Sequence, residues 1–316
     1  MGTGDSSKIY NNTFDPKQGS GIYVSRYTEV YNNTFRIETS PPTCEYGREE
    51  YSTAAIRLGD YHAKPGSPKA SVGNRIFNND ISIIARSYPE PAEYTPMAWG
   101  IFYSASGGEN YVYGNRISVN KVEPDSRVRT AALYICGGPN YFGGQFYDNQ
   151  ITTNVPAAWV ASMYGGASNS HLYNNTIIPL DDKPFPTFIM GHSACESCYA
   201  NNVAFSSNEV RGGEFEIAAS DQDHSYSVSW TLDLTIKKAN GNPVAGAAVK
   251  VLDRNGKVAL ETGSDEVGIV EAQLKEYSVD GKNKITLTPY TIVVGELEKE
   301  VDLNSNQNIT MTIVSQ

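Results

Sequence analysis

A six-residue pattern of apolar and polar positions recurs along the first two thirds of the chain. Each copy holds an apolar residue, two variable residues, an asparagine, one polar residue and a second apolar residue. The copies span residues 9–14, 30–35, 76–81, 112–117, 146–151, 172–177 and 205–210, and their asparagines are Asn12, Asn33, Asn79, Asn115, Asn149, Asn175 and Asn208. The intervals between these asparagines are too irregular for a helical solenoid with a repeat of fixed length.

The recurring asparagine predicts a corner at which the chain leaves one strand and enters the next. Asparagine tolerates the left-handed backbone conformation that such a corner needs. Corners stacked about 4.8 Å apart would let the side-chain amides hydrogen-bond along a column. Irregular intervals then represent insertions at other corners, where extra loop length costs little. The alternative, unrelated hairpins with exposed asparagine-rich turns, explains the shared spacing less well.

A second short strand is expected in each coil, at residues 22–25, 56–59, 101–104, 133–136, 160–163, 188–191 and 215–218. Alternation points the first and third residues of each strand inward and the second outward. Together the two patterns resemble the right-handed parallel β-helix family, which includes pectate-lyase-like and related carbohydrate-active proteins. The resemblance covers about residues 1–222 and implies a fold rather than a reaction.

A different pattern begins after the last repeat. Short alternating strands are separated by turn signals such as Asn240-Gly-Asn-Pro243 and Asp253-Arg-Asn-Gly256. This predicts a small antiparallel sandwich. Residues 239–249 resemble the Ig-like, carboxypeptidase-regulatory-type modules, which implies a spacer, stabilising or attachment role. The expected fold class is therefore all-β, with a right-handed parallel β-helix over 1–224 and an Ig-like β-sandwich over 225–316.

Composition and charge narrow the partners. The chain has 316 residues, a net charge of −10, and 21 tyrosines beside 10 phenylalanines and 3 tryptophans. Nucleic-acid binding needs clustered Lys and Arg, so the acidic balance argues against it. No apolar run is long enough to span a bilayer. No signal peptide is recognisable, and because repeats begin near residue 9 we expect a fragment of a secreted or cell-surface protein whose leader and upstream coils are missing.

Four cysteines leave several interpretations open. Cys195 and Cys198 have a spacing that suits a redox pair, half of a zinc site, or a local disulfide that closes a corner loop. The disulfide is favoured, because no helix is signalled there and too few further ligands lie nearby. Cys136 is expected to face outward at a strand end, where pairing with Cys44 is an option. No cofactor and no metal site are indicated.

The outward residues of the second strand form the candidate binding face. In the expected register they are Tyr23, Arg57, Phe102, Tyr134, Ala161, Ile189 and Glu216, with Arg26, Asp60, Ala105, Gly137, Tyr164, His192 and Ala219 at the edge. Aromatic rings stack on sugar rings, while Arg and Asp bind hydroxyl or carboxylate groups. Tyr23, Arg57, Asp60, Phe102, Tyr134 and Tyr164 are therefore the candidate polysaccharide contacts. The same row also suits a side-chain ladder that only stabilises the sheet.

Loops and histidines complete the sequence-based expectations. The long loops 37–53, 84–98 and 121–130 would wall the face, and Tyr46, Arg48, Tyr88, Tyr94 and Arg127 could contribute contacts from them. His62, His171 and His224 are expected in solvated loops, so His192 is the one histidine expected on the face.

Three functions follow from this face. The first is polysaccharide binding by a secreted or surface protein. The second is a structural scaffold that self-associates or contacts other surface proteins. The third is a polysaccharide lyase or glycoside hydrolase, with Arg57, Asp60 and His192 as catalytic candidates and Glu49, Glu50 or Glu109 as loop carboxylates that could complete a pair. The sequence motifs of pectate lyases and polygalacturonases are absent.

Overall fold

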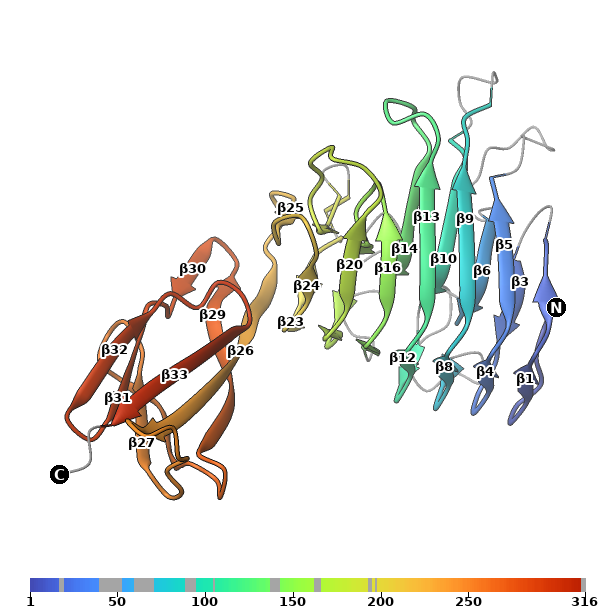
Figure 1. The fold of residues 1–316 in the computed structure, drawn as a ribbon. Helices are drawn as coiled ribbons and strands as arrows, with labels where there is room; N and C mark the ends of the chain where they lie inside the picture. The colour runs from blue at the N-terminus through green and yellow to red at the C-terminus, as the bar shows by residue number, and fades with distance from the viewer. Residues whose placement is uncertain are drawn as a thin grey trace. The chain divides into compact units, whose positions relative to one another are not determined.

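The described part of the chain consists of strands and irregular segments (Figure 1). A computed structural model describes residues 1–16, 20–39, 53–59, 71–88, 95–104, 106–136, 143–161, 166–192, 195–196 and 198–313. These residues form two compact units. The first comprises Met1–Val203 with Val210–Ser225, and the second comprises Ala204–Glu209 with Tyr226–Gln316.

The first unit is built from three stacked parallel sheets. Sheet A runs in the order β3 (Ser20–Val24), β6 (Thr53–Leu58), β10 (Met97–Tyr103), β14 (Arg129–Ile135), β17 (Ala158–Val160), β21 (Phe188–Met190) and β25 (Ile217–Ala219). Sheet B contains β1 (Lys8–Tyr10), β4 (Glu29–Tyr31), β8 (Arg75–Phe77), β12 (Tyr111–Tyr113), β15 (Gln145–Tyr147) and β19 (His171–Tyr173). Sheet C contains β2 (Thr13–Phe14), β5 (Thr34–Glu38), β9 (Asp80–Ala85), β13 (Arg116–Lys121), β16 (Gln150–Thr153) and β20 (Thr176–Pro179).

The chain visits sheets B, C and A in turn and then repeats the cycle one strand further along (Figure 1). Two short parallel pairs lie on the connections between sheets A and B, β7 (Ser71–Val72) with β11 (Ser106–Gly108) and β18 (Ala167–Ser168) with β22 (Ala200–Asn201). The strands β23 (Val203–Ser206) and β24 (Glu209–Val210) fall where the chain passes between the two units. This winding of stacked parallel strands fits a parallel β-helix.

A column of asparagine side chains joins the coils at the corner between sheets B and C. Asn33 Nδ2 donates to Asn79 Oδ1 at 3.1 Å, and the bond from Asn79 to Asn115 is 3.0 Å. The same side-chain bond links Asn12 to Asn33, Asn115 to Asn149, and Asn149 to Asn175. Each acceptor oxygen also receives the backbone N–H of the preceding asparagine. These bonds satisfy polar groups that would be costly to bury unpaired.

The left-handed residue at this corner is not the column asparagine, so that expectation was wrong. Positive φ angles occur one residue earlier, at Asn11, Asn32, Asn78, Gly114, Asp148, Asn174 and Ser207. The column asparagine turns its side chain inward instead, as in Asn115, which is 0% exposed. Two adjacent positions therefore have different roles: the first adopts the left-handed backbone conformation, and the second, the column asparagine, makes the side-chain hydrogen bonds.

A second corner, before sheet B, carries a shorter column of the same kind. Asn74 Oδ1 accepts the Thr28 N–H at 2.8 Å, and Asn74 Nδ2 donates to Asn110 Oδ1 at 2.8 Å. The residues before these three, Tyr27, Gly73 and Glu109, have positive φ angles. Side-chain hydrogen bonds thus fix both ends of β4, β8 and β12, which constrains the register of this part of sheet B.

The second unit contains two sheets. One has the order β26 (Ser225–Lys238), β29 (Ile269–Asp280), β30 (Asn283–Thr286), with β33 (Gln307–Ile313) paired to β26 in parallel. The other, fully antiparallel, has the order β28 (Val258–Gly263), β27 (Ala248–Leu252), β31 (Tyr290–Val294) and β32 (Leu297–Val301). Trp230, Leu232, Leu234 and Ile236 are buried at alternate positions of β26. The parallel β26–β33 pair differs from the wholly antiparallel arrangement expected.

Candidate functional site

The register of sheet A places one outward column across all of its strands. Tyr23 pairs with Arg57, Arg57 with Phe102, and Phe102 with Tyr134. The column then continues through Trp159, Ile189 and Ala218. The first four positions and the sixth, Ile189, agree with the sequence-based register. Ala161 and Glu216 do not belong to the column, because the fifth and seventh strands begin two residues away from where the apolar pattern placed them.

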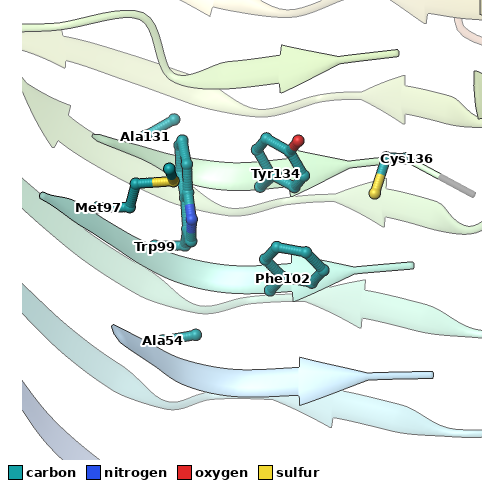
Figure 2. Packing of buried hydrophobic residues seen from close by; sticks show 7 residues of the cluster. All are labelled: Ala54, Met97, Trp99, Phe102, Ala131, Tyr134 and Cys136. Atoms are coloured by element: carbon teal, nitrogen blue, oxygen red, sulfur yellow. The ribbon is translucent and has the colours of Figure 1, made fainter. Parts of the chain in front are cut away.

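A bend in sheet A brings a second outward column beside the first. Gly100 lies on the inner side, where a Cβ atom would stand 2.5 Å from the Ala132 carbonyl oxygen and 3.1 Å from Ile117 Cγ2. Two successive inward residues, Gly100 and Ile101, leave both Trp99 and Phe102 on the outer face. Figure 2 shows the resulting sheet A cluster, which consists of Ala54, Met97, Trp99, Phe102, Ala131, Tyr134 and Cys136. These residues belong to β6, β10 and β14 or directly follow β14, and Trp159 of β17 packs against them.

Most of this cluster is buried, which corrects the expectation of an open aromatic platform. Phe102 is 4% exposed and Tyr134 1% exposed. Their rings stack on each other with centroids 4.8 Å apart, and Trp99 lies 4.5 Å from Tyr134 at a tilt of 43°. Trp99 was not singled out from the sequence, because the bend at Gly100 breaks the simple alternation. Phe102 and Tyr134 therefore act first as packing residues.

Arg57 lies between two aromatic rings from neighbouring coils. Its Cζ atom is 4.2 Å from the centroid of Phe102 and 5.7 Å from that of Tyr23. In such cation–π contacts the electrostatic attraction between the guanidinium and the ring faces restricts the motion of the arginine side chain. Tyr23 is 44% exposed, so this end of the column presents an aromatic ring and a half-buried cation to solvent.

Further along the column, beyond Tyr134, three half-buried side chains lie near one another: Arg129, Trp159 and His192. The Arg129 Cζ atom is 5.9 Å from the centroid of the Trp159 ring. The His192 ring stacks against Trp159 at 6.2 Å with 27° between the planes. Burial, and then the positive charge of Arg129, lower the pKa of His192. Sequence reasoning found His192 but missed Arg129 and Trp159, since the register error put Ala161 in the place of the tryptophan.

Several residues named in the sequence-based expectations lie outside the described residues: Asp60, Tyr164, Cys44, Tyr46, Arg48, Glu49, Glu50, His62, Tyr94, Ala105 and Gly137. Of the described loop residues, Tyr88 donates its hydroxyl to the Thr39 carbonyl at 2.5 Å and Arg127 is exposed. Glu109 occupies the turn that precedes sheet B, one residue before Asn110. The structure therefore does not bring Glu109 to the outward column of sheet A.

The catalytic candidates Arg57 and His192 are not neighbours. Arg57 belongs to β6 and His192 follows β21, four strand positions further along the sheet. At about 4.8 Å per strand these residues are roughly 19 Å apart, too far to act on one bond.

A Ser–His contact elsewhere in the first unit is structural rather than catalytic. His224 is 2% exposed, and its Nδ1 accepts the Ala200 N–H at 3.0 Å. In the neutral ring the proton then resides on Nε2, which donates to Ser220 Oγ at 3.1 Å. Ser220 in turn donates to Gln222 Oε1. Since Nε2 already carries the proton, it cannot accept one from the serine. His224 and the half-buried His171 on β19 are thus not the solvated loop residues that the sequence predicted.

A disulfide joins Cys195 and Cys198, with their Cα atoms 5.3 Å apart. This is the arrangement that the sequence favoured among the three interpretations. Cys136 is 3% exposed within the sheet A cluster. Its pairing with Cys44 stays a prediction, because Cys44 is outside the described residues.

Sheet B carries a second line of aromatic rings on its outer side. Tyr10, Tyr31, Phe77, Tyr113, Tyr147 and Tyr173 form this aromatic ladder, with neighbouring centroids 4.8 to 5.1 Å apart and planes 5 to 9° from parallel. Each ring occupies the second position of the repeated six-residue pattern, two residues before the column asparagine. The signal was therefore present in the sequence. Stacked rings turn their faces toward each other and only their edges toward solvent.

Neither a metal-binding cluster nor a membrane-spanning helix is present in the described ranges. No group of His, Cys, Asp or Glu side chains there is arranged to hold a metal ion. Over the same ranges the structure contains no helix with the length and hydropathy needed to cross a membrane.

Comparisons with known proteins leave the family open. No protein-family model matches the chain, and no curated protein matches it. Among solved structures, the Bacillus anthracis TIE protein is similar over 33% of this chain and 19% of its own length. The sequence identity is 14% and the TM-score is 0.22. The match thus spans about a fifth of that protein.

Proposed function

We propose that this protein is secreted or displayed at a cell surface and binds polysaccharide along the outward column of sheet A. One observation carries the proposal: aromatic and arginine side chains occupy successive positions of this column in register, from Tyr23 and Arg57 to Trp159. A linear sugar chain has a repeat that such a column can follow. Aromatic faces contact the apolar faces of sugar rings, and guanidinium groups donate to hydroxyl or carboxylate oxygens.

The burial of the middle of the column divides the face into two contact regions. Tyr23 and Arg57 form one, and Arg129, Trp159 and His192 form the other. Phe102 and Tyr134 lie between them and hold the flanking residues in place. The Cys195–Cys198 disulfide supports an oxidising compartment. The resemblance to pectate-lyase-like β-helices and to Ig-like accessory modules supports the same proposal.

The test compares matched tyrosines on the two sheets. Tyr23 on sheet A and Tyr10 on sheet B are 44% and 49% exposed. Binding of an acidic, a sulfated and a neutral polysaccharide is measured by affinity electrophoresis and calorimetry. Tyr23→Ala and Trp159→Ala should each weaken binding roughly tenfold, the value of one stacked ring, whereas Tyr10→Ala should leave it unchanged. Absence of binding across the panel, or equal binding by all variants, would refute the proposal.

The aromatic ladder favours a second candidate, a structural scaffold. A line of ring contacts alongside the asparagine column stiffens the stack of coils, as expected of a stalk or an assembling subunit. Electron microscopy at increasing protein concentration tests this directly. Filaments or rings would support the scaffold, and a monomer at all concentrations would argue against assembly.

A lyase or hydrolase stays the third candidate. An increase in ultraviolet absorbance from unsaturated uronates would reveal a lyase, and new reducing ends without that absorbance would reveal a hydrolase. Neither product from a broad panel would leave binding as the function.

A further inference from the structure

Two basic side chains from neighbouring regions of sheet A contact Trp159, the fifth residue of the outward column. Arg129 begins β14, Trp159 is the middle residue of β17, and His192 follows β21 by two residues. The Arg129 Cζ atom lies 5.9 Å from the centroid of the Trp159 ring, and the His192 ring centroid lies 6.2 Å from it. One indole is therefore bordered by two basic side chains.

The indole is held in a fixed orientation. Its Nε1 donates to the Gly191 carbonyl at 3.2 Å. The rings of Trp99 and Tyr134 contact it at 6.2 and 6.5 Å, with planes 69° and 68° from its own. Trp159 can therefore receive a ligand without first losing side-chain freedom, which favours binding.

The charge on this trio depends on protonation. Burial and the charge of Arg129 lower the pKa of His192, which favours the neutral imidazole. Arg129 is a charged side chain whose field acts on this ring, and the neighbouring group from β17 is the uncharged Trp159. An anion placed beside both residues would offset the repulsion from Arg129 and favour the imidazolium.

Resting on the polysaccharide binding proposed above, we propose that Arg129, Trp159 and His192 form a subsite for a sugar unit that bears a carboxylate or sulfate group, and that His192 takes up a solvent proton as this group binds. The sugar ring packs on Trp159. Arg129 donates charge-assisted hydrogen bonds to the anion, and the protonated His192 supplies a second cation. The chain as a whole has a net charge of −10, so this subsite is a local exception that selects its ligand by charge.

The experiment measures affinity and proton uptake by calorimetry with the whole protein. The probes are a galacturonate oligosaccharide, a sulfated galactan oligosaccharide and a neutral galactan oligosaccharide of equal length. Both anionic probes stay ionised between about pH 7.5 and about pH 5.5, so any proton taken up belongs to the protein. We expect the affinity for one or both anionic probes to rise roughly tenfold on acidification, the value of one charge-assisted hydrogen bond.

Matched variants assign the effect to the subsite. His192→Gln should abolish the proton uptake and flatten the pH dependence, and Arg129→Gln should weaken binding of the anionic probe at both pH values. His171→Gln is the control, because burial also lowers the pKa of His171, but this residue lies on sheet B. That variant should bind as the wild type does. Thermal unfolding verifies that each variant is folded, and His192→Asn provides a second neutral replacement.

The outcomes separate the two proposals. If no probe binds at either pH, both the polysaccharide function and the subsite are overturned. If the neutral probe binds as tightly as the anionic probes, polysaccharide binding stands and the anion subsite is overturned. If His192→Gln keeps the proton uptake, the role of His192 is overturned. The probe that gains affinity on acidification identifies the group as carboxylate or sulfate.

Discussion

Sheets A and B of the first unit each carry a line of aromatic side chains, and the rings of the two lines pack differently. In the aromatic ladder on sheet B, every contact is a near-parallel stack, with planes 5 to 9° apart, and the rings are at least partly exposed. In the sheet A cluster the contacts are stacked, tilted and edge-on, the central rings are buried, and arginines lie at both ends. The regular stacking on sheet B fits a contact that is repeated from coil to coil. The irregular packing around charged groups on sheet A fits the ligand-binding role proposed for it.

Ring orientation is the reason why we propose ligand binding for only one of these lines. In the ladder, neighbouring rings already cover each other's faces, so a sugar would meet hydrogen-bearing edges. In the sheet A column, Tyr23 and Trp159 keep exposed surface, and each has a guanidinium within 6 Å. The backbone repeat of 4.8 Å is common to both sheets. The difference therefore comes from the side chains and from the bend at Gly100.

The largest expected effect tests whether the cluster is a packing core. Trp99 is 1% exposed, so Trp99→Ala should lower the free energy of unfolding by about 3–5 kcal/mol. The Trp99 Nε1 is buried, and no hydrogen-bond partner is found for it in the described structure, so Trp99→Phe should cost much less. Urea unfolding followed by circular dichroism measures both. Equal losses for the two variants would contradict this account of Trp99.

A smaller effect is expected in the aromatic ladder. Tyr113→Ala and Tyr147→Ala should each destabilise the fold by about 1–2 kcal/mol, because each ring is half-buried and stacked on two neighbours. A double-mutant cycle should give a coupling of about 0.5–1.5 kcal/mol between them. Strictly additive effects would mean that the rings are adjacent without interacting.

Arg57 allows the contribution of a cation to be tested, because its charged guanidinium lies near the aromatic rings of Tyr23 and Phe102. Replacing it by Met keeps much of the side-chain volume and removes the cation, so Arg57→Met should cost about 0.5–2 kcal/mol. Arg57→Lys should recover part of this loss. If Arg57→Met were more stable than the wild type, the cation would be retained for ligand binding rather than for stability.

The smallest expected effect is a dependence of stability on pH, to which a histidine on each of the two sheets should contribute. Burial lowers the pKa of His171 and, together with Arg129, that of His192. The unfolded chain therefore binds protons more readily than the folded chain as pH falls through the ordinary histidine range near about 6.5. Stability should be complete above this range and decline below it. The midpoint of thermal unfolding, measured from about pH 7.5 to about pH 5, should fall less steeply in His171→Gln and in His192→Gln; a steeper fall would reverse the assigned sign.

The corners were predictable from sequence because one buried asparagine and its flanking apolar residues have a fixed spacing. That spacing is enforced by hydrogen bonds at each coil, for example from Asn115 to Asn149. The left-handed residue was assigned one position too late, because several corners contain two asparagines in a row. The ladder rings occupy the second position of the same pattern, but that position varies in residue type and therefore did not predict a stacked line of rings.

The sheet A site was predictable only in part. The short strands there have no invariant residue to fix their register, and Val160 was taken as the start of a strand that ends with it. Trp159 was thereby missed. Gly21, Ala55, Gly100 and Ala132 lie at equivalent positions of four neighbouring strands, and each directly precedes another inward residue. Two successive inward residues break the alternation on which the prediction depended. Burial of Phe102 and Tyr134 depends on tertiary packing, which a strand pattern does not encode.

The asparagine column has a consequence for how a protein of this kind can change its length. Each coil offers its neighbour the same amide donor and the same acceptor, and all the bonds point the same way along the chain. Deleting residues 80–115 would place Asn79 directly against Asn149 with an equivalent bond. Because each coil makes the same hydrogen bond to the next, duplication or loss of a whole coil can lengthen or shorten the molecule while the asparagine column stays continuous.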